Sequence, residues 1–496
     1  MRATLSLFVL VLLVAAAGPL EARGAYEDST GLPEEPIAGH IRGLLGAFES
    51  GDPDVAWRFI EGHFAPAFRE DPPKDVHLRV FADVHESSRG YDFVGIRHYT
   101  AGDPPDRTVA IVRNRLTEAW EAFVLETEPA PPHRIVSLSV TAARPPSHLP
   151  APVPLDLEQV GPALREFAQR MADADVFSGA LLLARGDRVL LQGAWGQASK
   201  SYSVPNRVDT KFNLGSMNKM ITAVAVAKLV EQGKLSFADP ISKYLSADWL
   251  PKVDKTKVRV EHLLTHTSGL GNYFNEKFQQ SSRALYREVD DFKPLVADET
   301  LAFEPGTDWR YSNTGMLVAG AIVASASARD YFDFVRREIY APAGMAASDC
   351  YDMDVAVPNL AMGYSRERTP EGVVWRSNLF QHVIRGGPAG GCFSTVEDLY
   401  RFARGLTAGR LVKRELVETL VAPKPALSSP GYGYGFDAGG EPGGRIVGHS
   451  GGFPGISSNL DIYLDSGFVA IVLSNYSGGS QAIQQKMREL IARIPR

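Results

Sequence analysis

Two kinds of hydrophobic spacing divide the first part of the chain. Segments 36–70 and 74–85 repeat apolar residues every three to four positions, which predicts helices with one buried face. From residue 91 onwards apolar and polar residues alternate instead, which is typical of half-buried strands. Helices followed by an antiparallel meander predict a small α+β domain over residues 35–142. The predicted strands span 91–100, 107–116, 120–128 and 134–141.

A proline-rich stretch follows this domain. Residues 143–156 contain five prolines, at 145, 146, 150, 152 and 154. Proline fixes φ and removes a backbone donor, so the stretch is predicted to be an extended, semi-rigid linker between two domains.

The remaining pattern predicts a second, larger domain over residues 157–496. Strand patterns lie near both of its ends, and helical spacing dominates from 216 to 343. The simplest packing is one antiparallel sheet built from both ends, flanked by the terminal helices, with an all-helical subdomain beside it. This is an α/β (α+β) fold with a natural substrate cleft beside the sheet. The terminal helices are predicted at 157–173 and 480–494, and the strands at 179–186, 188–196, 432–439, 444–451, 456–465 and 468–475.

Composition narrows the class of protein. The 496 residues are 44% hydrophobic and 22% charged, which is typical of a globular protein that can bury a sizeable core. The formal net charge is -6, so there is no bulk basic excess. A dedicated nucleic-acid binder is therefore not expected.

The first residues resemble an export signal. Arg2 precedes a compact apolar run, residues 5–17, and small residues with a Gly18-Pro19 break follow. The run is shorter than the roughly 20 residues that span a bilayer, so residues 1–25 are predicted to be a cleaved signal peptide rather than a stable membrane anchor. Cleavage after residue 17, 22 or 25 fits equally well. The protein is expected to be periplasmic or secreted.

Two cysteines, Cys350 and Cys392, are present. An exported protein could join them in a disulfide. The general tendency of free cysteine to be buried favours two unpaired thiols instead.

The first candidate for chemistry is Ser216-Met217-Asn218-Lys219, at the start of an apolar helix. It is the one S-x-x-K in the sequence. A serine at a helix N-terminus lies where backbone N–H groups are unpaired, and Lys219 one turn later returns over the same face. A lysine in a dry site loses its charge more easily, and could then accept the serine proton. The alternative is a helix cap with a solvated lysine.

The second candidate is Tyr311-Ser312-Asn313, between a Pro-Gly turn and an apolar helix. Tyr311 would be a phenolic base or proton shuttle if a nearby cation lowered its pKa. Asn313 would bind a substrate amide oxygen and hold Lys219. The similar Tyr273-Phe274-Asn275 lies in a polar stretch without a following apolar helix, so it ranks below Tyr311.

The third candidate is His449-Ser450-Gly451-Gly452, on or at the end of a late strand. Paired glycines let a ligand approach the backbone closely. The N–H of Gly452 could join that of Ser216 in an oxyanion hole. A glycine-rich hairpin corner is the structural alternative.

In this order the three elements resemble the serine β-lactamase and penicillin-binding-protein superfamily, specifically its class C and related esterase and D-stereospecific peptidase branch. The resemblance spans residues 157–496 and includes "VRVEHLLTHTSGL", "FEPGTDWRYSNTGMLVAG" and "GGPAGGCFSTVEDLYRFARGL". The N-terminal domain resembles, in pattern, the cone-shaped nuclear-transport-factor-like domain. Such cones hold a pocket in some relatives and act as spacers or dimerisation units in others, so a homo-oligomer formed through this domain is one possibility.

The resemblance implies roles for these residues. Ser216 would be the acylated nucleophile, and Lys219 and Tyr311 the proton shuttle. Asn313 would position the shuttle and the substrate. His449 stands where a lysine is often found, with Ser450, Gly451 and Gly452 completing the substrate-binding strand.

Histidine is mostly neutral near pH 7, so strong capture of a β-lactam carboxylate is not expected. An exported serine hydrolase of esterase or D-peptidase type is therefore predicted to act on a small-molecule or peptide substrate. The alternatives are a β-lactamase and a non-catalytic cell-wall or peptide-binding protein. No metal and no organic cofactor is implied; the His262 and His266 pair, four apart, lacks a third ligand and the order of a zinc motif.

Overall fold

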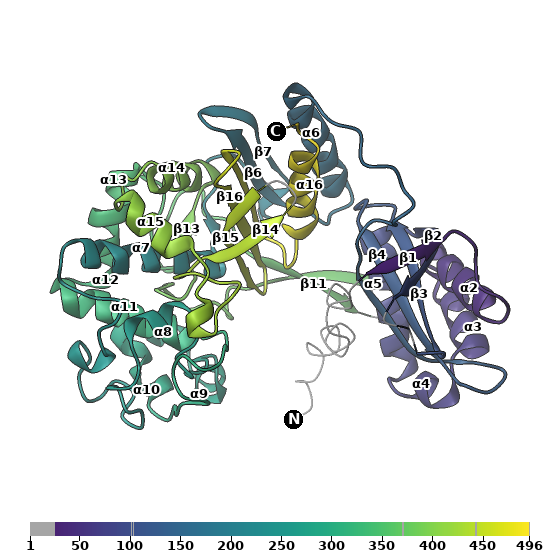
Figure 1. Ribbon diagram of the computed structural model, residues 1–496, viewed down its shortest axis with the longest axis horizontal. Coiled ribbons are helices and arrows are strands. Elements are labelled where there is room, and N and C mark those ends of the chain that lie inside the picture. The colour runs from purple at the N-terminus through teal and green to yellow at the C-terminus, as the bar shows by residue number, and fades with distance from the viewer. Residues whose placement is uncertain (1–24, 101, 103, 370–371, 442–443, 496) are drawn as a thin grey trace. The chain divides into compact units, whose positions relative to one another are not determined.

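A computed structural model describes residues 25–100, 102, 104–369, 372–441 and 444–495. The predicted signal peptide, apart from residue 25, lies outside these residues. The chain divides into two compact units, one ending at Val153 and one spanning Pro154–Arg496 (Figure 1).

The N-terminal unit is an antiparallel sheet with helices packed on it. Its strands follow the chain in the order β1-β2-β3-β4-β5. Apolar residues at helical spacing, including Ile41, Leu44 and Phe48, form its core with the inward side chains of the sheet. The elements are β1 (Tyr26–Ser29), α2 (Ile37–Ser50), α3 (Pro53–His63), α4 (Pro66–Glu70), α5 (Lys74–Ser88), β2 (Tyr91–Tyr99), β3 (Arg107–Asn114), β4 (Trp120–Thr127) and β5 (Ile135–Ala142).

Two details of this unit differ from the sequence prediction. The stretch 36–70 is three helices, because Gly51 adopts a left-handed φ of 64° after α2 and Phe64 is extended after α3. Strand β1 was not predicted, since four residues are too few for a pattern. It is held by a buried ion pair in which Asp28 Oδ1 lies 2.9 Å from Arg97 Nε. The likeness to a nuclear-transport-factor-like cone stays a prediction.

The C-terminal unit confirms the predicted fold class. Its main sheet has the antiparallel order β14-β15-β16-β17-β6-β7, so strands from both ends of the unit meet where β17 pairs with β6. Helices α6 and α16 pack side by side (Figure 1), α6 against β7 and α16 against β17. The sheet strands are β6 (Gly179–Arg185), β7 (Arg188–Trp195), β14 (Asp437–Glu441), β15 (Gly444–Phe453), β16 (Ile456–Tyr463) and β17 (Phe468–Ser474), and the two helices are α6 (Leu157–Asp173) and α16 (Gln481–Ala492).

The middle of this unit is mainly helical, as predicted. Its central helices α7 and α11 are apolar on nearly all sides and are buried against each other and their neighbours. An apolar helix of this kind belongs inside a core. The helices are α7 (Asn218–Glu231), α8 (Val260–Leu264), α9 (Glu276–Gln280), α10 (Lys293–Val296), α11 (Asn313–Ser327), α12 (Tyr331–Val335), α13 (Ala341–Ala343), α14 (Val396–Thr407) and α15 (Arg414–Val421), and the short strands are β8 (Gln197–Ser199), β9 (Val204–Pro205), β10 (Phe212–Asn213), β11 (Tyr364–Thr369), β12 (Gly372–Ser377) and β13 (Phe393–Ser394).

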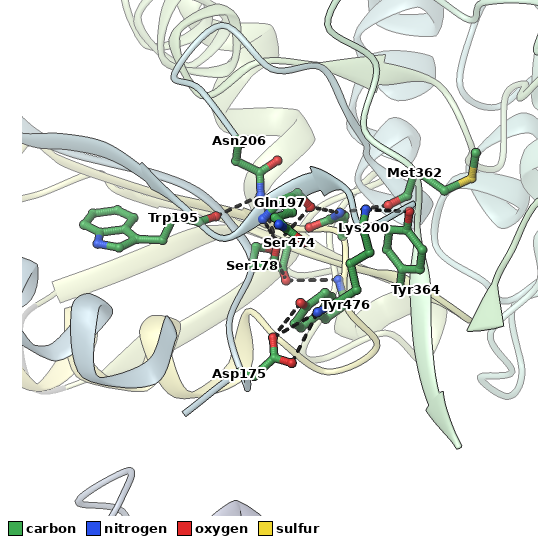
Figure 2. Close-up of polar contacts among 11 residues, drawn as sticks. Asp175, Ser178, Trp195, Gln197, Lys200, Asn206, Met362, Tyr364, Ser474 and Tyr476 are labelled. Atoms are coloured by element: carbon green, nitrogen blue, oxygen red, sulfur yellow. Dashed lines mark hydrogen bonds and ion pairs between the residues drawn. The ribbon is translucent and has the colours of Figure 1, made fainter. Parts of the chain in front are cut away.

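A polar network fixes the end of the sheet from which the chain runs towards Ser216 (Figure 2). Asn206 donates to Ser178 Oγ at 2.9 Å and to the Trp195 carbonyl at 2.8 Å. Asn475 bonds the carbonyls of Gln197 and Met362 at 2.9 and 2.8 Å. The segment that leads into β10 is thereby anchored to both β6 and β7.

Cys350 and Cys392 form a disulfide, so the prediction of two unpaired thiols is wrong. The physical reason is an antiparallel bridge in which Asp349 and Phe393 exchange backbone hydrogen bonds at 3.1 and 2.8 Å. This bridge places the neighbouring cysteines side by side, and no local sequence pattern indicates it.

The disulfide is expected to stabilise the C-terminal unit. Replacing both Cys350 and Cys392 by alanine should lower the free energy of unfolding by about 2–4 kcal/mol, because the unfolded chain is no longer constrained by the loop. Urea unfolding followed by tryptophan fluorescence measures the change. Reducing the wild-type protein should produce a similar shift, whereas reduction should not alter the double variant. Equal stability of the oxidised, reduced and substituted proteins would contradict this role.

Candidate active site

Ser216 lies in a short turn pressed against strand β15. The 3₁₀ turn Gly215–Met217 follows β10 and runs directly into α7. Gly215 has a φ of 51°, and a Cβ atom there would lie 3.0 Å from the Gly452 nitrogen. A Cβ atom on Gly451 would lie 2.0 Å from the Leu214 carbonyl oxygen. Only glycine permits this approach, which brings Ser216 to the glycine-rich part of β15.

Lys219 is completely buried one turn after Ser216. Its Nζ atom lies 2.9 Å from Ser216 Oγ, 2.8 Å from Asn313 Oδ1 and 2.5 Å from the Ala389 carbonyl oxygen. Burial lowers the pKa of Lys219 well below 10.5. The amide and carbonyl oxygens can only accept hydrogen bonds. Of the three partners of Lys219, only the Ser216 hydroxyl can donate a proton. A neutral Lys219 can therefore accept a proton only from Ser216 among them.

Tyr311 completes the convergence that the sequence predicts. Its hydroxyl lies near enough to Ser216 for the serine to affect its pKa, and Lys219 Nζ lies 4.9 Å from the centre of its ring. Burial raises the pKa of Tyr311 to about 12, although the neighbouring Ser216 hydroxyl lowers it in part. The condition under which Tyr311 would act as a base, a pKa lowered by a nearby cation, is therefore not met. Tyr311 is protonated at neutral pH and suited to donating or relaying a proton.

Asn313 is the first residue of α11, and its amide bridges two parts of the site. The Ser312 hydroxyl caps the helix by accepting from the Gly315 N–H at 2.8 Å. Asn313 Oδ1 accepts from Lys219, and its Nδ2 donates to Asn272 Oδ1 at 3.3 Å. Asn272 was missed because a lone polar residue in a loop carries no pattern. The competing Tyr273 is buried, and burial raises its pKa.

His449 is buried and neutral, as its residue type predicts. Its Nδ1 lies 2.5 Å from the Ser450 carbonyl oxygen and its Nε2 lies 2.8 Å from the Tyr432 hydroxyl. A carbonyl only accepts, so Nδ1 carries the hydrogen and Nε2 accepts from Tyr432. Burial, with a further contribution from Lys219, lowers the pKa of His449 to about 3. The position offers a substrate no permanent positive charge.

The open edge of β15 presents backbone donors to the site. β14 pairs with β15 only as far as Gly448, which is opposite Asp437. The N–H groups of residues two apart in a strand point to the same side. The Ser450 N–H faces the Asp437 carboxylate on the β14 side, so Gly452 N–H points to that side as well. Gly452 and the Ser216 turn, which are packed together, are therefore suitable for an oxyanion hole.

The loop 386–391 contributes backbone atoms that sequence reasoning missed. Ala389 accepts from Lys219, the Gly387 carbonyl accepts from Asn218 Nδ2 at 2.8 Å, and Gly391 N–H donates to the Gly215 carbonyl at 3.3 Å. Contacts made by backbone carbonyls do not depend on a particular side chain. The glycine-rich sequence of the loop was therefore the one available signal that it lies at the site. The disulfide at Cys392 holds the end of this loop.

His262 and His266 have structural contacts rather than a shared ligand. His262 Nδ1 accepts from the Arg259 N–H at 3.2 Å, and His266 Nδ1 accepts from the Ser312 N–H at 3.1 Å. The His266 ring also packs on the Tyr311 ring at 4.3 Å. In the described residues no group of three or more His, Cys, Asp or Glu side chains is placed to hold a metal ion.

The described helices include none with both the length and the apolar character needed to cross a bilayer.

The fold and the comparisons with known proteins together show that this chain is a serine hydrolase related to the β-lactamases. The chain belongs to the beta-lactamase family: the model for the family described as Beta-lactamase matches residues 164–493. It is 30% identical over 325 residues to penicillin-binding protein 4* of Bacillus subtilis, covering 63% of this chain and 71% of that protein. It is also 30% identical over 225 residues to the esterase EstB of Burkholderia gladioli, covering 43% and 56% of the two chains.

Solved structures show the same relationship. The crystal structure of a penicillin-binding protein from Bacillus halodurans aligns with a TM-score of 0.59 and 27% identity, covering 68% of this chain and 99% of that one. The family model matches residues 164–493, which lie in the C-terminal unit.

Proposed function

We propose that this protein is an exported serine hydrolase that forms an acyl-enzyme on Ser216 while cleaving an ester or a D-amino-acid amide. The observation that supports the proposal most directly is the hydrogen bonding of Lys219. Two of its three partners can only accept, so the neutral amine is directed at the one hydroxyl that can give up a proton.

The proposed reaction begins with attack by Ser216. Its Oγ atom bonds to the substrate carbonyl carbon while its proton passes to Lys219 Nζ, and the carbonyl π electrons move onto oxygen. The N–H groups of Ser216 and Gly452 stabilise that oxyanion. The oxyanion then re-forms the carbonyl and the bond between the carbonyl carbon and the leaving group breaks. The leaving group takes its proton from Tyr311, which recovers the Ser216 proton held by Lys219 as the acyl-enzyme forms. Water then attacks the acyl-enzyme by the same relay, and Ser216 is released.

The neutral His449 favours esters and D-amino-acid derivatives over β-lactams as substrates. A lysine at this position would offer a permanent charge to a β-lactam carboxylate, whereas His449 offers none. A β-lactamase is therefore the second candidate. A non-catalytic binding protein is a weaker alternative. Burying an amine costs free energy, and a site that has lost catalysis has no need for a buried amine bonded to a serine.

Export and assembly belong to the same proposal. The apolar run near the start of the sequence supports export, and the Cys350–Cys392 disulfide agrees with an oxidising compartment. For the N-terminal unit we propose a role as a spacer or as the contact in a homo-oligomer, from its α+β pattern.

The proposed role of Lys219 predicts the pH dependence of the reaction. The amine accepts a proton only when it is neutral, so kcat/KM for an uncharged ester should rise as the pH increases through the pKa of Lys219. Burial lowers that pKa, so the plateau should be reached well before pH 10.5. A pH profile of kcat/KM measures this. A rising limb centred at or above pH 10.5 would contradict the assignment.

A substrate panel tests the proposed function. The mature wild-type protein is assayed with p-nitrophenyl esters, D-Ala-D-Ala peptides and nitrocefin, and the kcat/KM values are compared. We expect the esters or the D-peptides to exceed nitrocefin. A nitrocefin value far above both would establish the second candidate instead, and turnover of none of the three classes would contradict a hydrolase of this type.

A further inference from the structure

An exposed carboxylate lies at the substrate-binding strand and has no part in the proposed proton relay. Asp437 is the first residue of β14 and is opposite Gly448 of β15. Its carboxylate faces the Ser450 N–H, within the predicted substrate-binding motif, and this N–H lowers the carboxyl pKa. Asp437 keeps an exposed surface, although the surrounding protein partly desolvates its carboxylate, so a ligand can reach the residue.

The register of β14 and β15 places the Asp437 carboxylate at one end of the open edge of β15. The Gly452 N–H, the proposed oxyanion donor, lies at the other end. Pairing between β14 and β15 stops at Gly448, so the edge from Ser450 to Gly452 has no β14 partner. Two residues along a strand cover about 7 Å. A group bound to Asp437 would therefore lie roughly 7 Å or more from the carbonyl oxygen held at Gly452.

The charges around this edge favour a cationic ligand. His449 is neutral, and the nearby Asp461 is bonded to Arg488, with Oδ2 2.7 Å from Nε. Lys219 is completely buried and bonded to its three partners. Within the described parts of the chain, Asp437 is in no ion pair. The open edge of β15 thus carries one accessible negative charge that is not offset by a direct cationic partner.

Asp437 is largely ionised at neutral pH. Partial desolvation by the surrounding protein raises the pKa of its carboxyl to about 6, and Asp461 adds to that rise, whereas the Ser450 N–H, Arg488 and Lys219 oppose it. These are the charged groups that act on Asp437 from the neighbouring strand β16, helix α16 and helix α7.

We propose that Asp437 is a specificity-determining residue that binds a cationic group of the substrate, an ammonium separated from the scissile carbonyl by several atoms. The inference rests on the proposed function of the Ser216 site. It names the substrate class as esters or amides with an amino or quaternary ammonium group in the leaving group or along the acyl chain. Substrates with a carboxylate at that place are disfavoured by repulsion.

Matched substrate pairs test the inference. The first pair is butyrylthiocholine and S-(3,3-dimethylbutyl) thiobutyrate, which have the same shape and differ in charge in the leaving group. The second pair is the p-nitrophenyl esters of 6-aminohexanoic and heptanoic acid, which differ in the acyl chain. For each pair the charged-to-neutral ratio of kcat/KM is measured at low salt in wild type, Asp437→Asn, Asp437→Glu and Asp187→Asn. Asp187, in the exposed β6–β7 turn, controls for the loss of one surface charge.

The wild-type ratio is expected to favour the cation by about fivefold in at least one pair, as for an exposed ion pair. The ratio should fall to about one in Asp437→Asn, persist in Asp437→Glu and Asp187→Asn, and weaken at high salt. The Asp437 charge could also alter the pKa of Lys219. Such an effect changes kcat/KM for both substrates of a pair equally, so it cancels in the charged-to-neutral ratio. Ratios that are unchanged by Asp437→Asn in both pairs would overturn the inference. Turnover that survives Ser216→Ala would instead overturn the proposed function.

Discussion

Replacing Ser216 by alanine is expected to lower kcat for p-nitrophenyl ester hydrolysis by a factor of about 10³ to 10⁶, with little change in KM. The hydroxyl is the attacking group in the proposed reaction, and nothing else at the turn can form the acyl bond. The side chain is only partly buried and starts a helix whose core is apolar, so the fold should tolerate alanine. Steady-state kinetics of the purified variant give the comparison.

The matched control for this variant is Ser201→Ala. Ser201 lies in an exposed turn between β8 and β9, and its removal should leave kcat and KM at wild-type values. Retention of more than about a tenth of wild-type kcat by Ser216→Ala would show that the reaction does not pass through this serine.

Replacing Lys219 by methionine is expected to lower kcat/KM by about 10³-fold or more, because the variant keeps the shape of the buried chain and loses the group that takes the Ser216 proton. A nucleophile and its base act as one unit, so adding Ser216→Ala to Lys219→Met should cost little more than either change alone. Kinetics of the two single variants and the double variant measure this non-additivity.

Lys228→Met is the control, because Lys228 is on the same helix but in its last turn, where it pairs with Glu231. It should retain wild-type kinetics. Fully multiplicative losses in Ser216→Ala and Lys219→Met would indicate that the two residues do not act together, and would contradict the proton transfer inferred from their 2.9 Å contact.

From the sequence we could predict those parts of the site that are determined by the pattern of side chains and by the geometry of a helix. Ser216 and Lys219 meet because residues three apart share a helix face. The packing of the sheet from both ends followed from short apolar strand patterns near residues 180 and 470. The approach of Tyr311 and His449 could be predicted only through a family resemblance, since no local rule relates positions so far apart.

The remaining parts depend on backbone contacts and on burial. Ala389 and Asn272 contribute through a carbonyl and a loop amide, which leave no pattern in the residue order. The disulfide depends on a bridge between Asp349 and Phe393 that local sequence does not specify. The direction of the Tyr311 pKa could not be predicted, because burial outweighs the neighbouring groups and burial is known only after folding.

The central claim is that the Ser216 hydroxyl, activated by Lys219 and Tyr311, becomes covalently acylated. The most direct measurement is peptide mapping by mass spectrometry after the wild-type protein reacts with a fluorophosphonate probe. We expect a single major adduct on the peptide that contains Ser216, and a large loss of labelling in Lys219→Met. A stoichiometric adduct on any other residue, with Ser216 unmodified, would contradict it.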